Sequence, residues 1–400
     1  MRFSRKIEAC ELSPMRKYHP FELEAVARGT KVYHLNIGQP DIETPKAFFD
    51  AVKNFSTSVL AYAPSAGMPP FIDAVRGYYQ KLGVELPEEA VHVTTGGSEA
   101  LTMVMQCILD EGDEVLIPEP FYPNYATFVK MTGGQIRPIP TTPEEGYRYA
   151  RRDRIEPLIN EHTRAILVTN PGNPTGSVLT AEEMRLIADI AKEHNLFLVS
   201  DEVYREFVYE EDRLSTMLSY DDLDENLVVV DSVSKRFSAC GARMGLVISR
   251  NRELMGQTRK LCQSRLCSAT LDQLGAAALY TVGPEYFAAV RDEYRRRRDT
   301  CMEGLARIPG VVCECPKGAF YIMAKLPVDN TDRFQEWLLK EFTYEGGTVM
   351  FAPGEGFYAT PGKGVDEVRL AYVLCQKDLE QAMKVLGEGI RLYRKQVMHE

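Results

Sequence analysis

Short, almost wholly apolar runs alternate with longer segments of helical periodicity through the middle of the chain. The expected strands span 91–94, 114–118, 165–170, 196–200, 227–231 and 245–249, with helices such as 98–109 and 181–194 between them. Strands that are apolar throughout are typical of a parallel sheet whose two faces are both covered by helices. The pattern therefore predicts an α/β fold, with a mostly parallel sheet flanked by helices on both faces in a large domain over residues 46–286.

The pattern changes after this region. A long, charge-rich helix is expected over 285–308, and strands over 318–326, 348–354 and 367–374 precede a last helix that begins near Lys377. This order predicts a second, smaller α+β domain built from both termini, residues 1–45 and 287–400. We expect the run Arg295–Arg298 to lie on a solvated helix face and Trp337 to pack in the core of the small domain.

Composition and charge narrow the class of protein. The 400 residues are 44% hydrophobic and 26% charged, which is ordinary for a soluble globular protein and excludes a disordered or fibrous one. No apolar run approaches the roughly 18 residues of a membrane span, and the N-terminus lacks the apolar stretch of a signal peptide. The net charge of −10 argues against binding to nucleic acid through phosphate neutralisation. We expect neither a nucleic acid nor a membrane as partner.

The cysteines point to a reducing compartment. There are nine, an odd number, and no CxxC pair occurs among them. Reduced thiols in a cytoplasmic protein explain this better than a disulfide framework. Cys313 and Cys315 have no histidine or third cysteine close in sequence, so we expect no metal site.

A glycine-rich turn follows the first expected strand. The sequence TTGGSEAL at 94–101 combines Gly97 and a second glycine, which allow close backbone approach, with the hydroxyl of Ser98 and the free N–H groups of the next helix. These are the parts of a phosphate-binding turn. A plain strand-to-helix connection capped by Ser98 fits the motif equally well.

Two further loops follow expected strands, at the sheet edge where ligands bind in open α/β folds. TNPGNPTG at 169–176 predicts a tight, non-helical loop that presents the amide of Asn173. SDEVY at 200–204 places Asp201 at the end of an all-apolar strand, with Tyr204 three residues later. A buried carboxylate stays ionised only beside a cation, and a protonated heterocyclic nitrogen would serve; the alternative is a helix-capping role for Asp201.

The fourth loop, DSVSKRFSACGARMG at 231–245, contains a lysine among small residues. Lysine is costly to desolvate, so Lys235 is best explained by an amine that works unprotonated, as a Schiff-base nucleophile or as a base. Arg243 follows near two glycines and is suited to hold a phosphate. A lone lysine in a loop is usually a solvated surface residue, but here four such loops follow four strands of one expected sheet.

The four motifs in this order resemble the class I/II aminotransferases, the fold-type-I enzymes that use pyridoxal 5′-phosphate (PLP), and in particular their aspartate-aminotransferase-like subgroup. The resemblance extends to the flanks NIGQPDIETP at 36–45, YAPSAGMPPF at 62–71 and VRLAYVL at 368–374. It implies a cofactor, PLP, in a large domain with a smaller domain beside it. It also implies a homodimer with shared active sites.

The resemblance assigns roles to single residues. Lys235 would form the Schiff base with PLP and carry the proton between the substrate and the cofactor, while Asp201 would keep the ring nitrogen protonated. Tyr204 and Asn173 would hydrogen-bond the ring oxygen, and Tyr122 would stack on the ring in place of a tryptophan common in aspartate-type members. The phosphate would be held by Gly97, Ser98, Ser232 and Arg243, and by Tyr62 of the other subunit.

The substrate would meet a smaller set of residues. Arg369 matches the family arginine that forks onto the α-carboxylate, and Gly38 and Asn173 would lie beside it. Aspartate with 2-oxoglutarate is the preferred pair, in a ping-pong reaction, although no second cation for a dicarboxylic substrate can be placed from the sequence. The aromatic residues of MFAPGEGFYATPGKG at 350–364 leave an aromatic or broad specificity open.

Other functions remain as alternatives. A PLP-dependent lyase or decarboxylase of the same fold would share every cofactor residue. A non-enzymatic regulator would need a DNA-binding domain that the first 35 or so residues do not resemble, and a dehydrogenase would need the missing GxGxxG fingerprint. None of the six histidines lies in the motifs, which disfavours Ser-His or metal-assisted hydrolysis.

Overall fold

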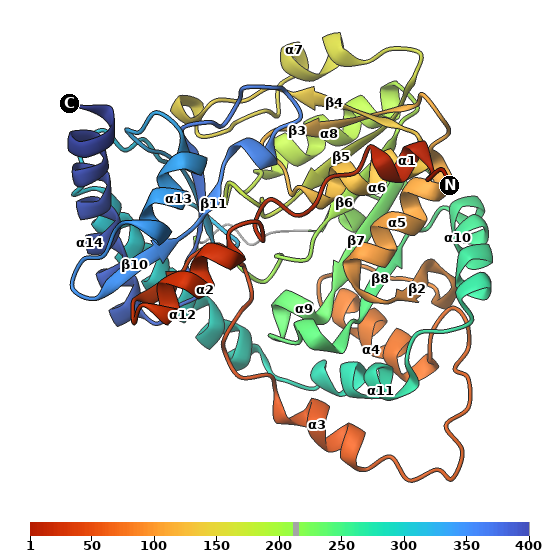
Figure 1. Ribbon diagram of the computed structural model, residues 1–400. Helices are drawn as coiled ribbons and strands as arrows, with labels where there is room; N and C mark the ends of the chain where they lie inside the picture. The colour runs from red at the N-terminus through yellow and green to blue at the C-terminus, as the bar shows by residue number, and fades with distance from the viewer. Residues whose placement is uncertain (211–215, 400) are drawn as a thin grey trace.

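A seven-stranded sheet forms the centre of the computed structural model, which describes residues 1–210 and 216–399 (Figure 1). Five neighbouring strands are parallel; β8 runs antiparallel to β7, and β2 antiparallel to β8. The strand order is β2 (Val91–Thr94), β8 (Gly245–Ile248), β7 (Leu227–Ser232), β6 (Phe197–Asp201), β5 (Thr163–Thr169), β3 (Glu114–Pro118) and β4 (Gln135–Ile139). This arrangement confirms the predicted α/β class with a mostly parallel sheet.

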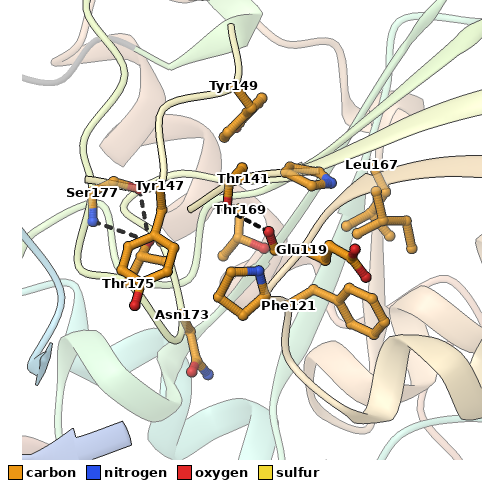
Figure 2. A pocket seen from close by; sticks show the side chains of 14 residues that line it. Glu119, Phe121, Thr141, Tyr147, Tyr149, Leu167, Thr169, Asn173, Thr175 and Ser177 are labelled. Atoms are coloured by element: carbon orange, nitrogen blue, oxygen red, sulfur yellow. Dashed lines mark hydrogen bonds between the residues drawn. The ribbon is translucent and has the colours of Figure 1, made fainter. Parts of the chain in front are cut away.

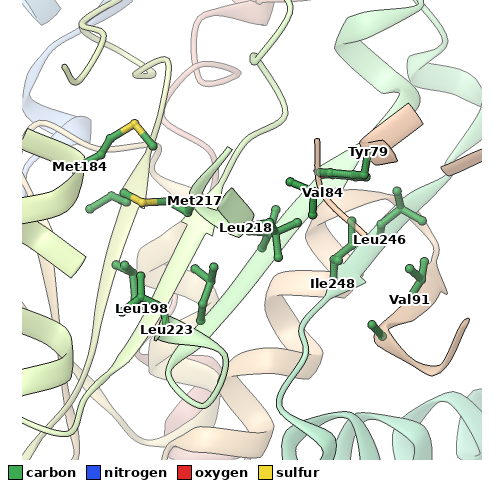
Figure 3. Packing of buried hydrophobic residues seen from close by; sticks show 14 of the residues in the cluster. Tyr79, Val84, Val91, Met184, Leu198, Met217, Leu218, Leu223, Leu246 and Ile248 are labelled. Carbon is green, nitrogen blue, oxygen red and sulfur yellow. The ribbon is translucent and has the colours of Figure 1, made fainter. Parts of the chain in front are cut away.

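Helices bury both faces of this sheet because successive residues of each strand point to opposite sides. In β7, Val229 packs with α4 (Pro69–Gln80), α8 (Ala181–Glu193) and α11 (Thr270–Leu279). Its neighbours Val228 and Val230 pack with α5 (Gly96–Ile108), α6 (Asn124–Thr132) and α10 (Arg252–Arg265). Figure 3 shows part of the first of these two apolar layers. The all-apolar strands are thus explained by burial on both faces.

A second group of strands and helices lies beside the sheet (Figure 1, mostly blue, with α2 in red). Strands β11 (Ala352–Pro353), β12 (Glu367–Ala371) and β9 (Tyr321–Lys325) form an antiparallel sheet, and β1 (Lys31–His34) pairs in parallel with β10 (Gly347–Met350). Helices α2 (His19–Ala27), α12 (Pro284–Leu305), α13 (Thr331–Lys340) and α14 (Gln376–Tyr393) accompany them. Trp337 packs here against Phe334, Phe342 and Tyr393, as predicted. The proposed division at residues 46 and 286 stays a prediction.

Four short helices complete the described chain. They are α1 (Arg5–Glu8), α3 (Lys46–Lys53), α7 (Arg152–Ile155) and α9 (Val233–Arg236). No helix in residues 1–210 and 216–399 is both long enough and apolar enough to cross a membrane.

One expectation about α12 is wrong. Of the run Arg295–Arg298, only the first two side chains are solvated; Arg297 and Arg298 are buried. Arg297 Nη1 donates to Asp41 Oδ1 (2.6 Å), and Arg298 Nη1 donates to the carbonyl of Pro316 (3.1 Å). Burial is tolerated because these acceptors, which lie outside α12, satisfy the guanidinium groups.

Candidate active site

The carboxyl ends of β5, β6 and β7 meet at one edge of the sheet, because the three strands are adjacent and parallel. Their loops carry Asn173, Tyr204 and Lys235 into a common cavity of about 310 Å³. The N-terminal segment and strands β9 and β12 contribute the opposite wall, including Gly38, Tyr321 and Arg369. This is the position where open α/β sheets bind ligands.

Lys235 projects into the cavity from α9, directly after β7. Its Nζ donates a hydrogen bond to the carbonyl of Gly38 (2.8 Å) and lies 3.8 Å from Cys240 Sγ. No carboxylate forms an ion pair with this amine among the residues that the structure describes. Gly38 itself must be glycine, because a Cβ there would lie 1.8 Å from the hydroxyl of Tyr321.

Asp201 is a buried carboxylate with two neutral donors. Its Oδ2 accepts from Tyr125 OH (2.6 Å) and its Oδ1 from the N–H of Val203 (3.3 Å). Within the described chain, no lysine, arginine or histidine pairs with it. Burial raises the pKa of Asp201 to about 6. An anion in this position calls for a cationic ligand group.

The glycine-rich turn and the loop after β7 form a wall of the cavity that attracts anions, in contrast to the negative charge of Asp201. Gly97 and Ser98 lie in the first turn of α5, whose N–H groups and dipole favour negative charge. Arg243 approaches this turn so closely that a Cβ on Gly96 would lie 2.3 Å from its Nη2. Ser232 caps α9 by accepting from the N–H of Ser234 (2.9 Å). The wall offers hydroxyls, backbone donors and a guanidinium to one anionic group.

Arg369 is almost fully buried yet reaches the same cavity. Nη1 donates to Asn173 Oδ1 (3.0 Å), and Nη2 donates to the carbonyl of Asn36 (2.6 Å). The guanidinium also lies over the ring of Tyr321. Its Nε has no partner within the described residues. Since its partners are neutral, this arginine is held in place with its charge free for an anionic ligand.

Four tyrosines of the described chain line the cavity. Tyr204 OH lies 2.9 Å from Tyr321 OH, and the amide of Asn173 donates to Tyr204 OH (3.4 Å). Tyr122 packs edge-to-face on Tyr125, with ring centroids 5.5 Å apart. Burial raises the pKa of Tyr204 and that of Tyr122, so both phenols stay protonated donors at neutral pH.

A second, much smaller cavity lies against the loop that bears Asn173. Figure 2 shows this loop with Glu119, Thr141 and Tyr147 around a cavity of about 30 Å³. That volume holds a water molecule or two but no metabolite. The space therefore reflects loop packing, and the larger cavity is the candidate site.

The structure brings the predicted site residues together with one exception. The residues that line the larger cavity are Gly38, Gly97, Ser98, Tyr122, Asn173, Asp201, Tyr204, Ser232, Lys235, Arg243 and Arg369. The exception, Tyr62, is 79% exposed and lies outside the cavity. Its expected contact is with another subunit, which leaves that role a prediction.

Sequence reasoning missed Tyr125, Tyr321 and Arg16, which also line the cavity. A hydroxyl in the apolar strand GAFYIMAKL was a usable signal for Tyr321, because a buried phenol needs a partner. Tyr125 lies in the first turn of α6, three residues after Tyr122, and the two rings pack edge-to-face. Nothing in the local sequence distinguishes Arg16 from the other charged residues near the N-terminus.

Comparison with known proteins identifies the family. Residues 30–386 match the family model described as "Aminotransferase class I and II". This chain belongs to the class I and II aminotransferases. It is therefore an enzyme, a transaminase, and the resemblance inferred from the four motifs is confirmed.

Named relatives of this aminotransferase differ in their amino donors. It is 32% identical to the aspartate aminotransferase of Pyrococcus horikoshii, with 92% of this chain and 93% of that one covered. It is 31% identical to aromatic-amino-acid aminotransferase 2 of Thermococcus litoralis, with coverage of 97% and 99%. The solved alanine aminotransferase of Pyrococcus furiosus superposes with a TM-score of 0.89 at 30% identity, covering 98% and 100%. The relatives support the reaction class without selecting one donor.

Beneath the cavity, the aminotransferase holds a buried group of charges. Asp231 accepts from Arg205 Nη2 (2.8 Å), Arg236 Nη2 (2.7 Å), Tyr79 OH (3.0 Å) and the N–H of Ser232 (2.7 Å). Each arginine directly follows a residue of the site, Tyr204 or Lys235. The group thus ties two site loops to the end of β7.

No metal site accompanies this cavity in the described part of the chain. There, no three histidine, cysteine, aspartate or glutamate side chains are grouped so that they could hold a metal ion.

Proposed function

We propose that this aminotransferase transfers the amino group of an L-amino acid, with aspartate as the preferred donor, to 2-oxoglutarate, using PLP in a ping-pong reaction. We propose further that it works as a cytoplasmic homodimer. One observation carries the proposal: a lysine amine, an uncompensated buried carboxylate and an anion-attracting turn line one cavity.

The residues of the cavity fit PLP in three separate respects. Asp201 offers a buried negative charge for the ring nitrogen, whose positive charge would offset the cost of burying this carboxylate. The first turn of α5, with Ser232 and Arg243, offers donors for the phosphate. Lys235 offers an amine for the aldehyde. When bound, PLP supplies an electron sink for the α-carbon of the substrate.

The protein's own residues would bind the substrate and move its proton. Arg369, held by Asn173 and Asn36, would receive the α-carboxylate in a charge-assisted pair. The amine of Lys235 would act as the general base that removes the α-proton of the substrate and as the acid that returns it. Tyr204 and Asn173 would donate hydrogen bonds to the ring oxygen of the cofactor. Both substrates would use this one cavity in turn, which gives ping-pong kinetics.

The test is a chemical label at Lys235. Borohydride treatment of the holoenzyme, followed by peptide mapping, should place the reduced pyridoxyl group on Lys235 and on no other lysine. Lys235→Ala should still bind PLP without a covalent bond and should lose multiple-turnover transamination. A label elsewhere, or an active Lys235→Ala variant, contradicts the assignment.

Product analysis separates transamination from its closest alternative. Incubation of the holoenzyme with an amino acid alone should yield the matching 2-oxo acid and pyridoxamine phosphate in equal amounts, at about one per active site. Release of carbon dioxide or of a fragment of the side chain, with PLP unchanged, would instead identify a lyase or decarboxylase.

A further inference from the structure

Within residues 1–210 and 216–399, four cationic side chains line the catalytic cavity: Arg16, Lys235, Arg243 and Arg369. The proposed function uses the last three, for the aldehyde, the phosphate and the α-carboxylate. Arg16 remains without a role. Its side chain is exposed and forms neither a hydrogen bond nor an ion pair with any residue that the structure describes.

The N-terminal segment, residues 9–18, holds Arg16 at the mouth of the cavity. This segment runs between α1, which lies against α6, and α2, which packs on α13 (Figure 1, red). Met15 fixes it locally: its Sδ lies 3.0 Å from Arg369 Nη2, and its carbonyl accepts from Asn36 Nδ2 (3.4 Å). One peptide unit is about 3.8 Å long, so Arg16 is anchored next to the residue that would bind the α-carboxylate.

The neighbouring lysine is directed elsewhere. Lys17 pairs with Asp332 of α13 and lines a different cavity, which shares no cationic residue with the catalytic one. The two adjacent cations thus differ in whether they are paired and in which cavity they line. Arg16 is unpaired and faces the catalytic cavity, whereas Lys17 is neutralised and lies outside it.

The charge of the cavity lining favours a second anionic group on the substrate. Asp201 is the only acidic residue in the described lining, and it is buried at the floor, where the cofactor's ring nitrogen would neutralise it. With the α-carboxylate on Arg369, an additional carboxylate on the same ligand would meet only the positive charge of Arg16.

We propose that Arg16 binds the side-chain carboxylate of a dicarboxylic amino acid or 2-oxo acid whose α-carboxylate is held by Arg369. This inference rests on the proposed function and deepens it, because it names the residue that would select C4 and C5 dicarboxylates such as aspartate and 2-oxoglutarate. Guanidinium suits the task, since its planar fork can bind a carboxylate through two parallel hydrogen bonds.

The first test measures binding without chemistry. Calorimetry on the PLP-loaded enzyme would compare succinate with butyrate, which has the same chain length but one carboxylate. Arg16→Met should weaken succinate binding at least about 10-fold and leave butyrate within about twofold, and Arg16→Lys should recover part of the loss. Lys17→Met, the matched control, should change neither. Equal weakening of both ligands by Arg16→Met, or none for succinate, would overturn the proposal.

The second test separates this proposal from the proposed function. The single-turnover reaction of the holoenzyme with aspartate or alanine alone would be followed by the loss of the cofactor's visible absorbance. Arg16→Met should lower the apparent second-order rate constant for aspartate at least about 10-fold relative to that for alanine. A parallel loss for both donors contradicts the role of Arg16. If the wild-type holoenzyme reacts with neither donor but binds succinate through Arg16, the proposed function fails and the dicarboxylate site stands.

Discussion

At the scale of single residues, Asp201 shows how an active site can be built at the expense of stability. A carboxylate in an apolar strand end, with only a phenol and one N–H as donors, is costly to ionise. The folded pKa of about 6 lies above the ordinary value of 3.8, a difference of about two units. Because each unit corresponds to about 1.4 kcal/mol, ionised Asp201 costs the cofactor-free fold roughly 3 kcal/mol at neutral pH.

We therefore expect Asp201→Asn to leave the cofactor-free protein as stable as wild type, or more stable, at pH 7.5. Because the pKa of Asp201 is raised on folding, its carboxyl is neutral and does not destabilise the wild-type fold below about pH 4. The destabilisation appears as the pH rises through 6 and the carboxyl ionises. The difference in free energy of unfolding between variant and wild type should accordingly shrink between pH 7.5 and pH 5. Urea titrations at the two pH values measure it. PLP affinity should fall in the variant, and a destabilised cofactor-free variant at pH 7.5 would refute this account.

At the scale of elements, a strand is predicted best from the sequence where burial alone decides which residue types it contains. The strands β2 and β3 were predicted to the residue, and all four residues of β2 and the three central residues of β3 are buried. Strand β4 was missed because Pro138 and Arg137 interrupt it. It lies at the sheet edge, where an unpaired position tolerates proline. The four site loops were found because strand ends carry their polar residues, whereas Arg16 reaches the cavity through long-range packing that no local pattern encodes.

The buried charges around Asp231 make a prediction about the loops they join. Burial raises the pKa of Asp231, but Arg236 and Arg205 outweigh it and hold the value below the ordinary one. Asp231→Asn would leave the buried guanidinium of Arg236 without a counter-charge and that of Arg205 with Glu202 alone, and should lower the free energy of unfolding by about 3–5 kcal/mol. Urea titration at neutral pH measures this. Asp153→Asn is the control, because its pair with Arg151 is exposed and screened by solvent, so its loss should change the free energy of unfolding little. Similar losses in the two variants would contradict a special role for the buried group.

At the scale of the whole molecule, one apolar surface has no partner within the described chain. Val59, Leu60 and Tyr62 are 72%, 59% and 79% exposed, and they lie on the segment between α3 and α4 along the outer edge (Figure 1, orange). Consecutive exposed apolar side chains of this size mark contact surfaces. A second copy of the chain is the partner that the proposed homodimer requires, and Tyr62 would then reach the phosphate in the other subunit's cavity.

A mixed-dimer experiment tests this sharing of sites. Tyr62→Phe should weaken PLP binding, and Lys235→Ala should abolish turnover. If Tyr62 acts across the interface, a mixed dimer of the two variants has one site with both defects and one intact site. Random pairing in equal amounts would then give intact sites in about a quarter of all cavities, detectable as transaminase activity at PLP concentrations too low for Tyr62→Phe alone.

If Tyr62 acts within its own chain, each mixed dimer carries one defect per site, and mixing restores nothing. Light scattering on the same samples fixes whether the 45.1 kDa chains are paired.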